Sequence, residues 1–200
     1  MYFSGSMEEP LKLLHSVVQA IHPLDQADWE ALSQIWKPFS ARRKEIITSA
    51  GETERYVYFV TDGVQRIYYL DDQSREATIA FTYRPSFGGI IDSVMMDVPS
   101  RYYYETLTPS SFIRAPYTEF KEVAYQRPAI ERMLRAGITQ TLSGILERLV
   151  EVQCFSSEDK FRNLLKRSPH ILQLVPHKYL ANYLGIDPTN FSKLVNKVRI

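Results

Sequence analysis

Cysteine and histidine are scarce in this chain, and their scarcity excludes several kinds of chemistry. Cys154 is the only cysteine among 200 residues, so neither an intrachain disulfide nor an iron–sulfur cluster held by several cysteines of one chain can form. Only four histidines are present, and none lies in the β-prone region between residues 46 and 113. A metal-dependent enzyme of the cupin type needs histidines and carboxylates that converge inside its barrel, which this pattern disfavours.

Long apolar runs and catalytic loop motifs are also missing. No stretch approaches the roughly 20 apolar residues of a membrane-spanning helix, and no secretory signal is apparent. The sequence contains no phosphate-binding glycine loop, nucleophile elbow or zinc-protease motif. We therefore expect a cytoplasmic protein that is not an enzyme and has no membrane partner. Met1 to Met7 is typical of a tag remnant before a natural start, or of a natural N-terminal tail, and is left out of the fold assignment.

Short β-prone runs, separated by turn residues, fill the middle of the sequence. Two amphipathic helices are expected before them, Leu11 to Ile21 and Asp25 to Trp36, with Asp25 as the cap of the second. Asp62-Gly63 stands between two runs and is a strong hairpin signal. The runs are Ile46–Thr48, Tyr56–Thr61, Val64–Leu70, Ala77–Tyr83, Tyr102–Thr108 and Phe112–Ile113. Many short strands at close spacing predict a sandwich or jelly roll.

The last part of the chain has the pattern of two short helices joined by a glycine turn. The apolar residues at helical spacing are Leu180 and Leu184 in the first segment and Phe191, Leu194 and Val198 in the second. Gly185 lies between the segments and can adopt turn conformations that other residues resist. The pattern predicts a helix-turn-helix, the motif that inserts its second helix into the major groove of DNA.

The charge of the chain is distributed unevenly. Lys160 and the residues after it include eight basic residues and one acidic residue, Asp187, for a net charge of +7. The rest of the chain has 16 basic and 22 acidic residues, for a net charge of −6. A basic end on an acidic body is typical of a protein that binds nucleic-acid phosphates. A solvated helical face is the alternative.

The polar residues of the second helix suggest which side chains read DNA. Those pointing away from the apolar face are Thr189, Ser192, Lys193 and Asn196. Lys193 can donate to guanine O6 and N7, and Asn196 can pair with adenine. Phosphate contacts, which set affinity and its salt dependence, are assigned to Lys178, Lys197 and Arg199.

A long helix is predicted from about Ala129 to about Gln153, after a short helix over Thr118 to Gln126. Its apolar residues are Leu134, Ile138, Leu142, Ile145, Leu149 and Val152. From Ile138 onward they recur at alternating steps of four and three residues, the spacing of a coiled-coil seam. One helix packed on its own domain is the alternative. We favour a parallel dimer helix, because DNA half-sites about 34 Å apart need two reading heads.

Together these parts resemble the Crp/Fnr family of bacterial transcription regulators. The phrases that carry the resemblance are the Gly51 and Gly63 turns, Ser86 to Ile90, Pro99 to Arg101, and the C-terminal motif. It implies an α+β fold with three parts. Residues 8–128 form a cyclic-nucleotide-binding-like β-roll sensor domain (a double-stranded β-helix or jelly roll), residues 129–155 a dimerisation helix, and residues 156–200 an all-α helix-turn-helix domain. The implied partners are double-stranded DNA at a palindromic operator, a second copy of the chain, and RNA polymerase as a further candidate.

The resemblance breaks at the nucleotide cassette. Cyclic-nucleotide-binding members carry Phe-Gly-Glu-Leu, in which the glutamate accepts a hydrogen bond from the ribose 2′-hydroxyl, whereas this chain has glycine at position 89. The nearest phosphate-pairing arginine is Arg101, and three tyrosines follow it instead of small residues. We therefore expect an unknown small effector other than cyclic AMP and assign no cofactor.

The resemblance points to Gly88, Gly89, Arg101 and Thr139 as the effector site. Thr139 can instead bond back to its own helix, as helical threonines commonly do. A surface ion pair is the alternative role of Arg101. Three alternative functions stay open: a regulator that responds to cyclic AMP, an effector-free regulator, and a β-roll ligand-binding protein that has lost DNA binding.

Overall fold

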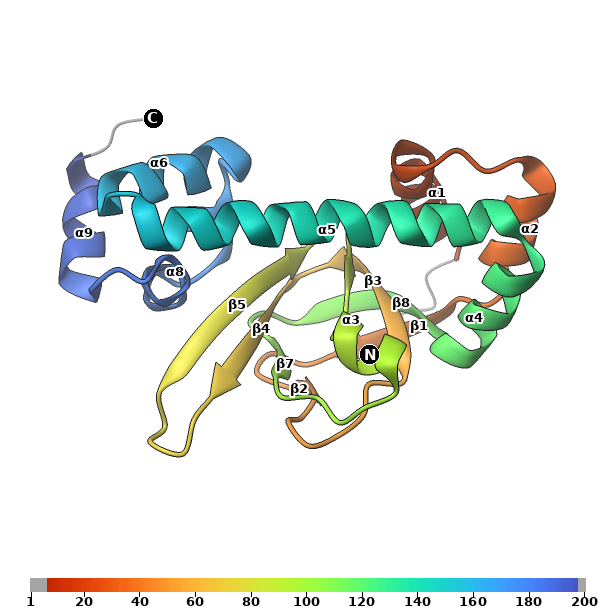
Figure 1. Cartoon of the computed structure of the whole chain (residues 1–200), viewed down its shortest axis with the longest axis horizontal. Coiled ribbons are helices and arrows are strands. Elements are labelled where there is room, and N and C mark those ends of the chain that lie inside the picture. Colours follow the sequence, from red (N-terminus) through yellow and green to blue (C-terminus); the bar gives the residue numbers. More distant parts are fainter. Residues whose placement is uncertain (1–6, 198–200) are drawn as a thin grey trace. The chain divides into compact units, whose positions relative to one another are not determined.

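The computed structural model describes residues 7–197 and divides into two compact units. The first unit comprises residues 7–67 and 81–139, and the second comprises residues 68–80 and 140–197. The long helix α5 (Pro128–Cys154) contributes residues to both units (Figure 1). The predicted helix, Ala129 to Gln153, is therefore confirmed to within one residue at each end.

Eight strands form two four-stranded sheets among the described residues. They are β1 (Lys37–Ala41), β2 (Ile46–Thr48), β3 (Tyr56–Asp62), β4 (Val64–Leu70), β5 (Glu76–Tyr83), β6 (Ser86–Gly88), β7 (Tyr103–Thr106) and β8 (Ser110–Pro116). The sheet orders are β1-β8-β3-β6 and β2-β7-β4-β5. Strands β3 and β8 pair antiparallel, with Tyr58 opposite Arg114. The predicted α+β fold with a β-roll is confirmed.

The turn at Gly63 joins two sheets and does not close a hairpin, so the predicted pairing of the flanking strands is wrong. Gly63 has φ +86°, and a Cβ atom there would lie 2.6 Å from the carbonyl oxygen of Pro109. The residue must therefore be glycine at this turn. Strand β3 pairs with β6 and β8, whereas β4 lies between β7 and β5. The turn at Gly63 was predicted correctly, but the pairing of the strands beside it is determined by contacts with residues distant in the sequence.

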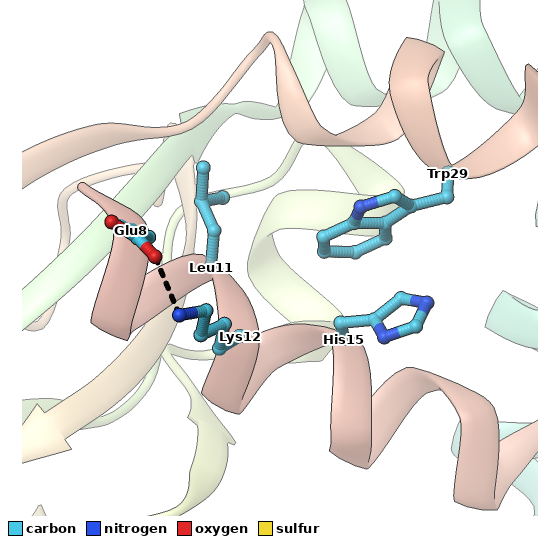
Figure 2. A pocket seen from close by; sticks show the side chains of 5 residues that line it. All are labelled: Glu8, Leu11, Lys12, His15 and Trp29. Atoms are coloured by element: carbon cyan, nitrogen blue, oxygen red, sulfur yellow. Dashed lines mark hydrogen bonds and ion pairs between the residues drawn. The ribbon is translucent and has the colours of Figure 1, made fainter. Parts of the chain in front are cut away.

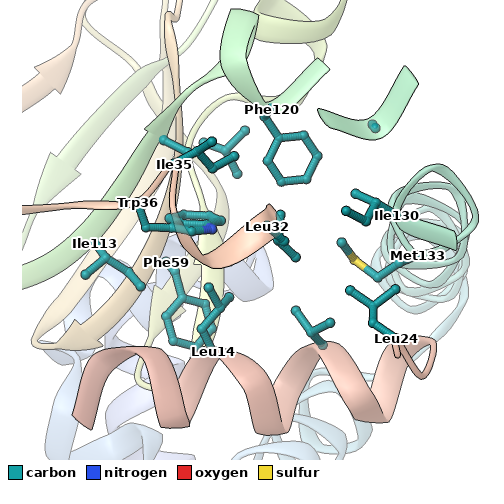
Figure 3. Close-up of a cluster of buried hydrophobic side chains, with 14 residues drawn as sticks. Leu14, Leu24, Leu32, Ile35, Trp36, Phe59, Ile113, Phe120, Ile130 and Met133 are labelled. Carbon is teal, nitrogen blue, oxygen red and sulfur yellow. The ribbon is translucent and has the colours of Figure 1, made fainter. Parts of the chain in front are cut away.

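Helices cover the outer face of the first sheet and bury its apolar side chains. These helices are α1 (Glu8–Ile21), α2 (Gln26–Ser33), α4 (Tyr117–Gln126) and the start of α5. Leu14, Phe59 and Ile130 are fully buried in this cluster (Figure 3). Asp25 caps α2 by accepting a hydrogen bond from the Asp28 amide at 2.8 Å, as predicted.

Helix α2 ends at Ser33, before the predicted end at Trp36. Trp36 is 4% exposed, and its ring centroid lies 6.3 Å from that of Phe120. The indole is therefore a core residue on the link between α2 and β1. Sequence analysis did not predict β1, β6 or the short helices α3 (Ile91–Met96) and α7 (Ile171–Leu174). Elements of three to six residues are too short to show a clear periodic pattern, and Pro38 within β1 makes that segment look unlike a strand.

The second unit contains the C-terminal helices α6 (Ser157–Arg167), α8 (His177–Leu184) and α9 (Pro188–Lys197), together with α7. Ser156 caps α6, because its hydroxyl accepts a hydrogen bond from the Asp159 amide at 3.2 Å. The rings of Phe161 and Phe191 meet edge to face, with centroids 5.4 Å apart. An apolar core of its own thus holds these helices together.

Candidate nucleic-acid interface

The turn between α8 and α9 has the geometry that the sequence predicts. Gly185 adopts left-handed backbone angles, φ +62° and ψ +38°, directly after α8. The Ile186 amide donates back to the Ala181 carbonyl at 2.9 Å, which closes the end of the helix. Leu180 and Leu184 are fully buried. The two helices therefore meet through their predicted apolar faces.

Helix α9 has one buried and one exposed face. Phe191 is 1% exposed and Leu194 is 6% exposed, so this face packs on the unit's core. The polar residues of the opposite side are all exposed: Thr189, Asn190, Ser192, Lys193, Asn196 and Lys197. Asn190 was not among the predicted site residues, although its place next to Thr189 could have suggested it. Val198 and Arg199, which the sequence placed in this motif, lie outside the described residues.

Some polar side chains of α9 and α8 already have partners within the chain. The Ser192 hydroxyl donates to the Pro188 carbonyl at 3.0 Å, and Lys197 Nζ lies 2.8 Å from Glu158 Oε2. Lys178 Nζ lies over the ring of Tyr179, 4.6 Å from its centroid. By contrast, the side chains of Thr189, Lys193 and Asn196 make no hydrogen bond or ion pair with any other described residue. These three lie on the side of α9 opposite its buried face.

The ion pair of Lys197 changes what that residue can do. The hydrogen bond from Lys197, helped by one from Arg162, lowers the pKa of Glu158 to about 2. Glu158 is therefore ionised throughout the physiological range. A phosphate that bound Lys197 would have to replace this carboxylate, so Lys197 is a weaker candidate for a phosphate contact than Lys178.

Helix α6 is fixed to the end of α5 by charged groups. Glu151 is 5% exposed and accepts hydrogen bonds from Arg167 Nη2 at 2.9 Å and Asn163 Nδ2 at 3.2 Å. The bond from Arg167 lowers the pKa of Glu151. Lys160 Nζ donates to the Val152 carbonyl at 2.9 Å, near the C-terminal end of α5, where a cation is favoured. One face of α5 therefore carries the C-terminal helices.

The side-chain amide of Asn182 joins α8 to strand β5. Asn182 Oδ1 accepts from the Thr78 amide at 2.6 Å, and Asn182 Nδ2 donates to the Glu76 carbonyl at 2.7 Å. Strand β5 is the edge of its sheet, and a neighbouring strand would use this same pair of backbone groups. Asn182 thus satisfies two groups of an open edge and holds the hairpin segment 68–80 on α8.

This contact predicts a local change in hydrogen exchange. Asn182→Ala removes the acceptor of the Thr78 amide, so the exchange of that amide should become at least about tenfold faster, the loss of about 1.4 kcal/mol of protection. Asn182→Asp keeps the oxygen acceptor and should keep most of the protection. Amide exchange followed by NMR measures both. The Arg75 amide, which donates to Asp71 Oδ1 at 2.8 Å, is the internal control and should not change. Equal rates for Thr78 in Asn182→Ala and the native chain would contradict the assignment.

The predicted effector residues have different surroundings in the structure. A Cβ atom at Gly88 would collide with Tyr104 Oη, and Gly89 has φ +100°. Arg101 is exposed, and the Thr139 hydroxyl donates to the Arg135 carbonyl at 2.8 Å. Within the described residues, no hydrogen bond or ion pair joins Arg101 or Thr139 to the two glycines. Thr139 bonds back to its own helix, which is the alternative that the sequence left open.

Cys154 and an apolar hollow are two further features of the described residues. Cys154 is exposed at the end of α5. The hollow, of about 240 Å³, lies between α1 and α2 and is lined by Leu11, His15 and Trp29, with Glu8 and Lys12 also at its edge (Figure 2). The rings of His15 and Trp29 are tilted by 60° to each other, with centroids 4.5 Å apart. The hollow contains none of the predicted site residues.

None of the helices within residues 7–197 is both long enough and apolar enough to cross a membrane. No group of three or more histidine, cysteine, aspartate or glutamate side chains in this range could hold a metal ion.

Comparison with known proteins places the fold. Residues 38–127 match the family model of the cyclic nucleotide-binding domain. A search of the curated proteins finds no relative of this sequence. Among solved structures, FixK2 from Bradyrhizobium japonicum superposes with a TM-score of 0.75 at 19% identity, over 82% of this chain and 84% of that one.

Two further structures extend the likeness to regulators. A protein described as a transcriptional regulator of the Crp/Fnr family from Eubacterium rectale has a TM-score of 0.66 at 16% identity, over 87% of this chain and 83% of its own. The c-di-GMP responsive global regulator CLP from Xanthomonas campestris has a TM-score of 0.62 at 17% identity, over 86% and 91%. The chain therefore has the fold of the Crp/Fnr transcription regulators. The match of residues 38–127 to the cyclic nucleotide-binding domain model agrees with this fold.

Proposed function

We propose that this chain is a homodimeric transcription regulator that reads a palindromic DNA operator with α9. It is not an enzyme, its activity responds to a small effector other than cyclic AMP, and RNA polymerase is a candidate partner. The observation that carries the proposal is the exposed face of α9. There the side chains of Thr189, Lys193 and Asn196 make no hydrogen bond or ion pair with other described residues, while Phe191 and Leu194 anchor the opposite face. A helix presented in this way fits the major groove.

The charge of the C-terminal region supports the choice of DNA as partner. The excess of seven positive charges from Lys160 onward attracts phosphates without regard to sequence. Arg162, Arg167 and Lys197 are partly neutralised by Glu158 and Glu151. Lys178 and Lys193 have no carboxylate within ion-pair distance among the described residues and are the better placed cations for phosphate and base contacts.

The proposal of a dimer is supported by an exposed apolar face of α5. Leu142, Ile145, Leu146, Leu149 and Val150 are each 51–53% exposed and recur at the spacing of one helical face. Glu151, which binds α6, lies on the other side of the helix. An exposed apolar stripe beside a DNA-reading motif fits pairing with a second copy of the same helix. Two copies would supply the two reading heads that a palindromic operator needs.

Selection of duplexes from a random-sequence library at fixed salt, with and without cyclic AMP, tests the proposal. We expect enrichment of a palindromic site in both conditions. A site recovered only with cyclic AMP would establish a nucleotide-responsive regulator instead. Absence of any enriched site, with no gel shift at low salt, would contradict DNA binding and favour a β-roll protein that has lost it.

Lys193 is expected to determine base specificity. Lys193→Ala should cost about 1–3 kcal/mol of discrimination between the selected site and a site changed at one base pair. Competition binding measures this quantity. Lys178→Ala is the matched control: it should weaken binding to all sequences alike and reduce the slope of log K against log salt by about 0.9. Unchanged discrimination in Lys193→Ala would refute its role as a base reader.

A further inference from the structure

The interior of the β-roll is filled by aromatic side chains from four different strands. Phe39 on β1, Tyr58 on β3, Tyr104 on β7 and Phe112 on β8 lie in mutual contact. Tyr58 lies with its ring centroid 5.8 Å from those of both Tyr104 and Phe112. Phe39 lies 5.7 Å from Phe112 and 5.9 Å from Tyr58. Tyr104 is 0% exposed and is among the largest fully buried side chains of the chain.

The phenol of Tyr104 ends at the cassette itself. Its oxygen lies 3.0 Å from Thr82 Oγ1, which lies 2.8 Å from the side-chain amide of Gln65. The backbone N–H of Gly89 hydrogen-bonds the same phenol oxygen, while burial raises the pKa of Tyr104 and keeps it neutral. The polar end of the ring therefore has partners on two sides. A bound ligand would have to displace these hydrogen bonds.

Both cassette glycines are explained by this packing. Any side chain at Gly88 would occupy the position of Tyr104 Oη, because a Cβ atom there collides with it. Gly89 has φ +100°, and a Cβ atom would lie 3.1 Å from Tyr58 Cδ2. The two glycines allow the Tyr104 and Tyr58 rings to approach the backbone. No ligand is needed to explain them.

The two groups that the family resemblance implies for binding a cyclic nucleotide, a glutamate at position 89 and an arginine near position 101, are missing from this interior. Position 89 offers no carboxylate for a ribose hydroxyl, and Arg101 is exposed. Arg114 is the cation that enters the interior, with its guanidinium between Phe39 at 4.0 Å and Tyr56 at 4.1 Å from the ring centroids. Both faces of that guanidinium are covered by rings. The residues present therefore do not fit the ligand that the domain family implies.

We infer that the roll of this chain is a self-filled domain in which the Tyr104 phenol permanently occupies the cassette, so that no cyclic nucleotide binds there. This inference rests on the proposed function in its choice of an effector other than cyclic AMP, whereas DNA binding does not depend on it. It confines the effector of the proposed function to a site outside the interior of the roll. It also predicts that removing the phenol opens a cavity of matching shape.

Thermal unfolding of the full chain with added ligands tests the inference. Cyclic AMP or cyclic GMP at about 1 mM should change the Tm of the native chain by less than about 1 °C. Tyr104→Ala should lower the Tm, and p-cresol, which carries the ring and hydroxyl of the lost phenol, should raise it again by at least about 2 °C. The native chain and Tyr125→Ala, which removes a phenol that is 86% exposed, should not respond to p-cresol.

Each outcome either supports or overturns the inference that the roll is self-filled. A saturable rise in the Tm of the native chain with either nucleotide would overturn the inference. So would a folded Tyr104→Ala that ignores p-cresol. If Tyr104→Ala does not fold, Tyr104→Phe keeps the ring and tests the hydroxyl network: it should fold, melt lower than the native chain and remain insensitive to both nucleotides. DNA binding is measured separately by gel shift, so its failure would not be confused with failure of this inference.

Discussion

Leu142→Glu combined with Leu149→Glu should convert the proposed dimer to a monomer and abolish its tight binding to a palindromic operator. The two leucines are 53% and 51% exposed in the single chain, seven residues apart on one face of α5. Apolar area of this kind stabilises a dimer at about 25 cal/mol per Å² buried. Two glutamates on each helix would place four like charges at the seam and remove that gain.

The effect on DNA follows from the linkage of two reading heads. Binding of the second head to an operator is intramolecular in a dimer, which raises the affinity by a factor of about 10² to 10⁴ over a single head. The double variant should lose a factor in this range for the palindromic site. Its affinity for one half-site should change little, because the substitutions are in α5 and the half-site is read by α9. Light scattering gives the oligomeric state, and titration of labelled duplexes gives both affinities.

Gln140→Glu is the matched control for this experiment. Gln140 is exposed and lies on the opposite side of α5 from Leu142, so the added charge should leave the dimer intact. Circular dichroism should show the same helix content in all variants, since the substituted side chains are already exposed. A double variant that remains dimeric at micromolar concentration would eliminate the α5 face as the dimer interface.

The features that sequence analysis predicted well depend on neighbours in the chain. The turn at Gly185 and the cap at Asp25 each involve residues within a few positions of one another. Helical spacing likewise placed Leu184 and Leu194 in the core of the second unit. Local patterns of this kind carry their own physical cause, because a backbone conformation or a cap is decided within one turn.

The features that it missed depend on contacts far along the chain. Strand β3 was expected to pair with β4 through Gly63, yet it pairs with β6 and β8. Asn182 bonds a strand edge 104 residues away at Thr78, and Lys197 pairs with Glu158, 39 residues away. The residues around Lys197 in the sequence do not indicate that a carboxylate pairs with it. The candidate site was therefore predicted as a set of exposed residues, without the ion pairs that distinguish Lys193 from Lys197.

Glu105→Ala should destabilise the first unit more than any surface change, by about 3–5 kcal/mol of unfolding free energy. Glu105 lies on β7 and accepts from Arg66 Nε at 2.7 Å, and the side chains of the two residues are 9% and 3% exposed. Removing the carboxylate leaves the Arg66 guanidinium buried without the charge that compensates its desolvation. An uncompensated buried charge costs more than the pair itself contributes.

Lys44 provides the comparison within the same cluster. Its Nζ lies 3.1 Å from the other oxygen of Glu105, but its side chain is 41% exposed. Lys44→Ala should therefore cost at most about 1 kcal/mol, as exposed ion pairs do. Replacing both buried partners, with Arg66→Met and Glu105→Leu, should recover more than half of the loss, because no buried charge then remains. Urea unfolding at one fixed protein concentration measures all three, since dimerisation would make stability depend on concentration.

The ranking of these variants separates two explanations of the buried pair. If burial of charge dominates, Glu105→Ala is the least stable, the double variant lies between it and the native chain, and Lys44→Ala is close to native. If Glu105 acted only through ordinary hydrogen bonds, its loss would cost about 1 kcal/mol, near that of Lys44. Equal urea midpoints for Glu105→Ala and Lys44→Ala would therefore contradict the expectation that the buried ion pair between β4 and β7 stabilises the unit more than the exposed one.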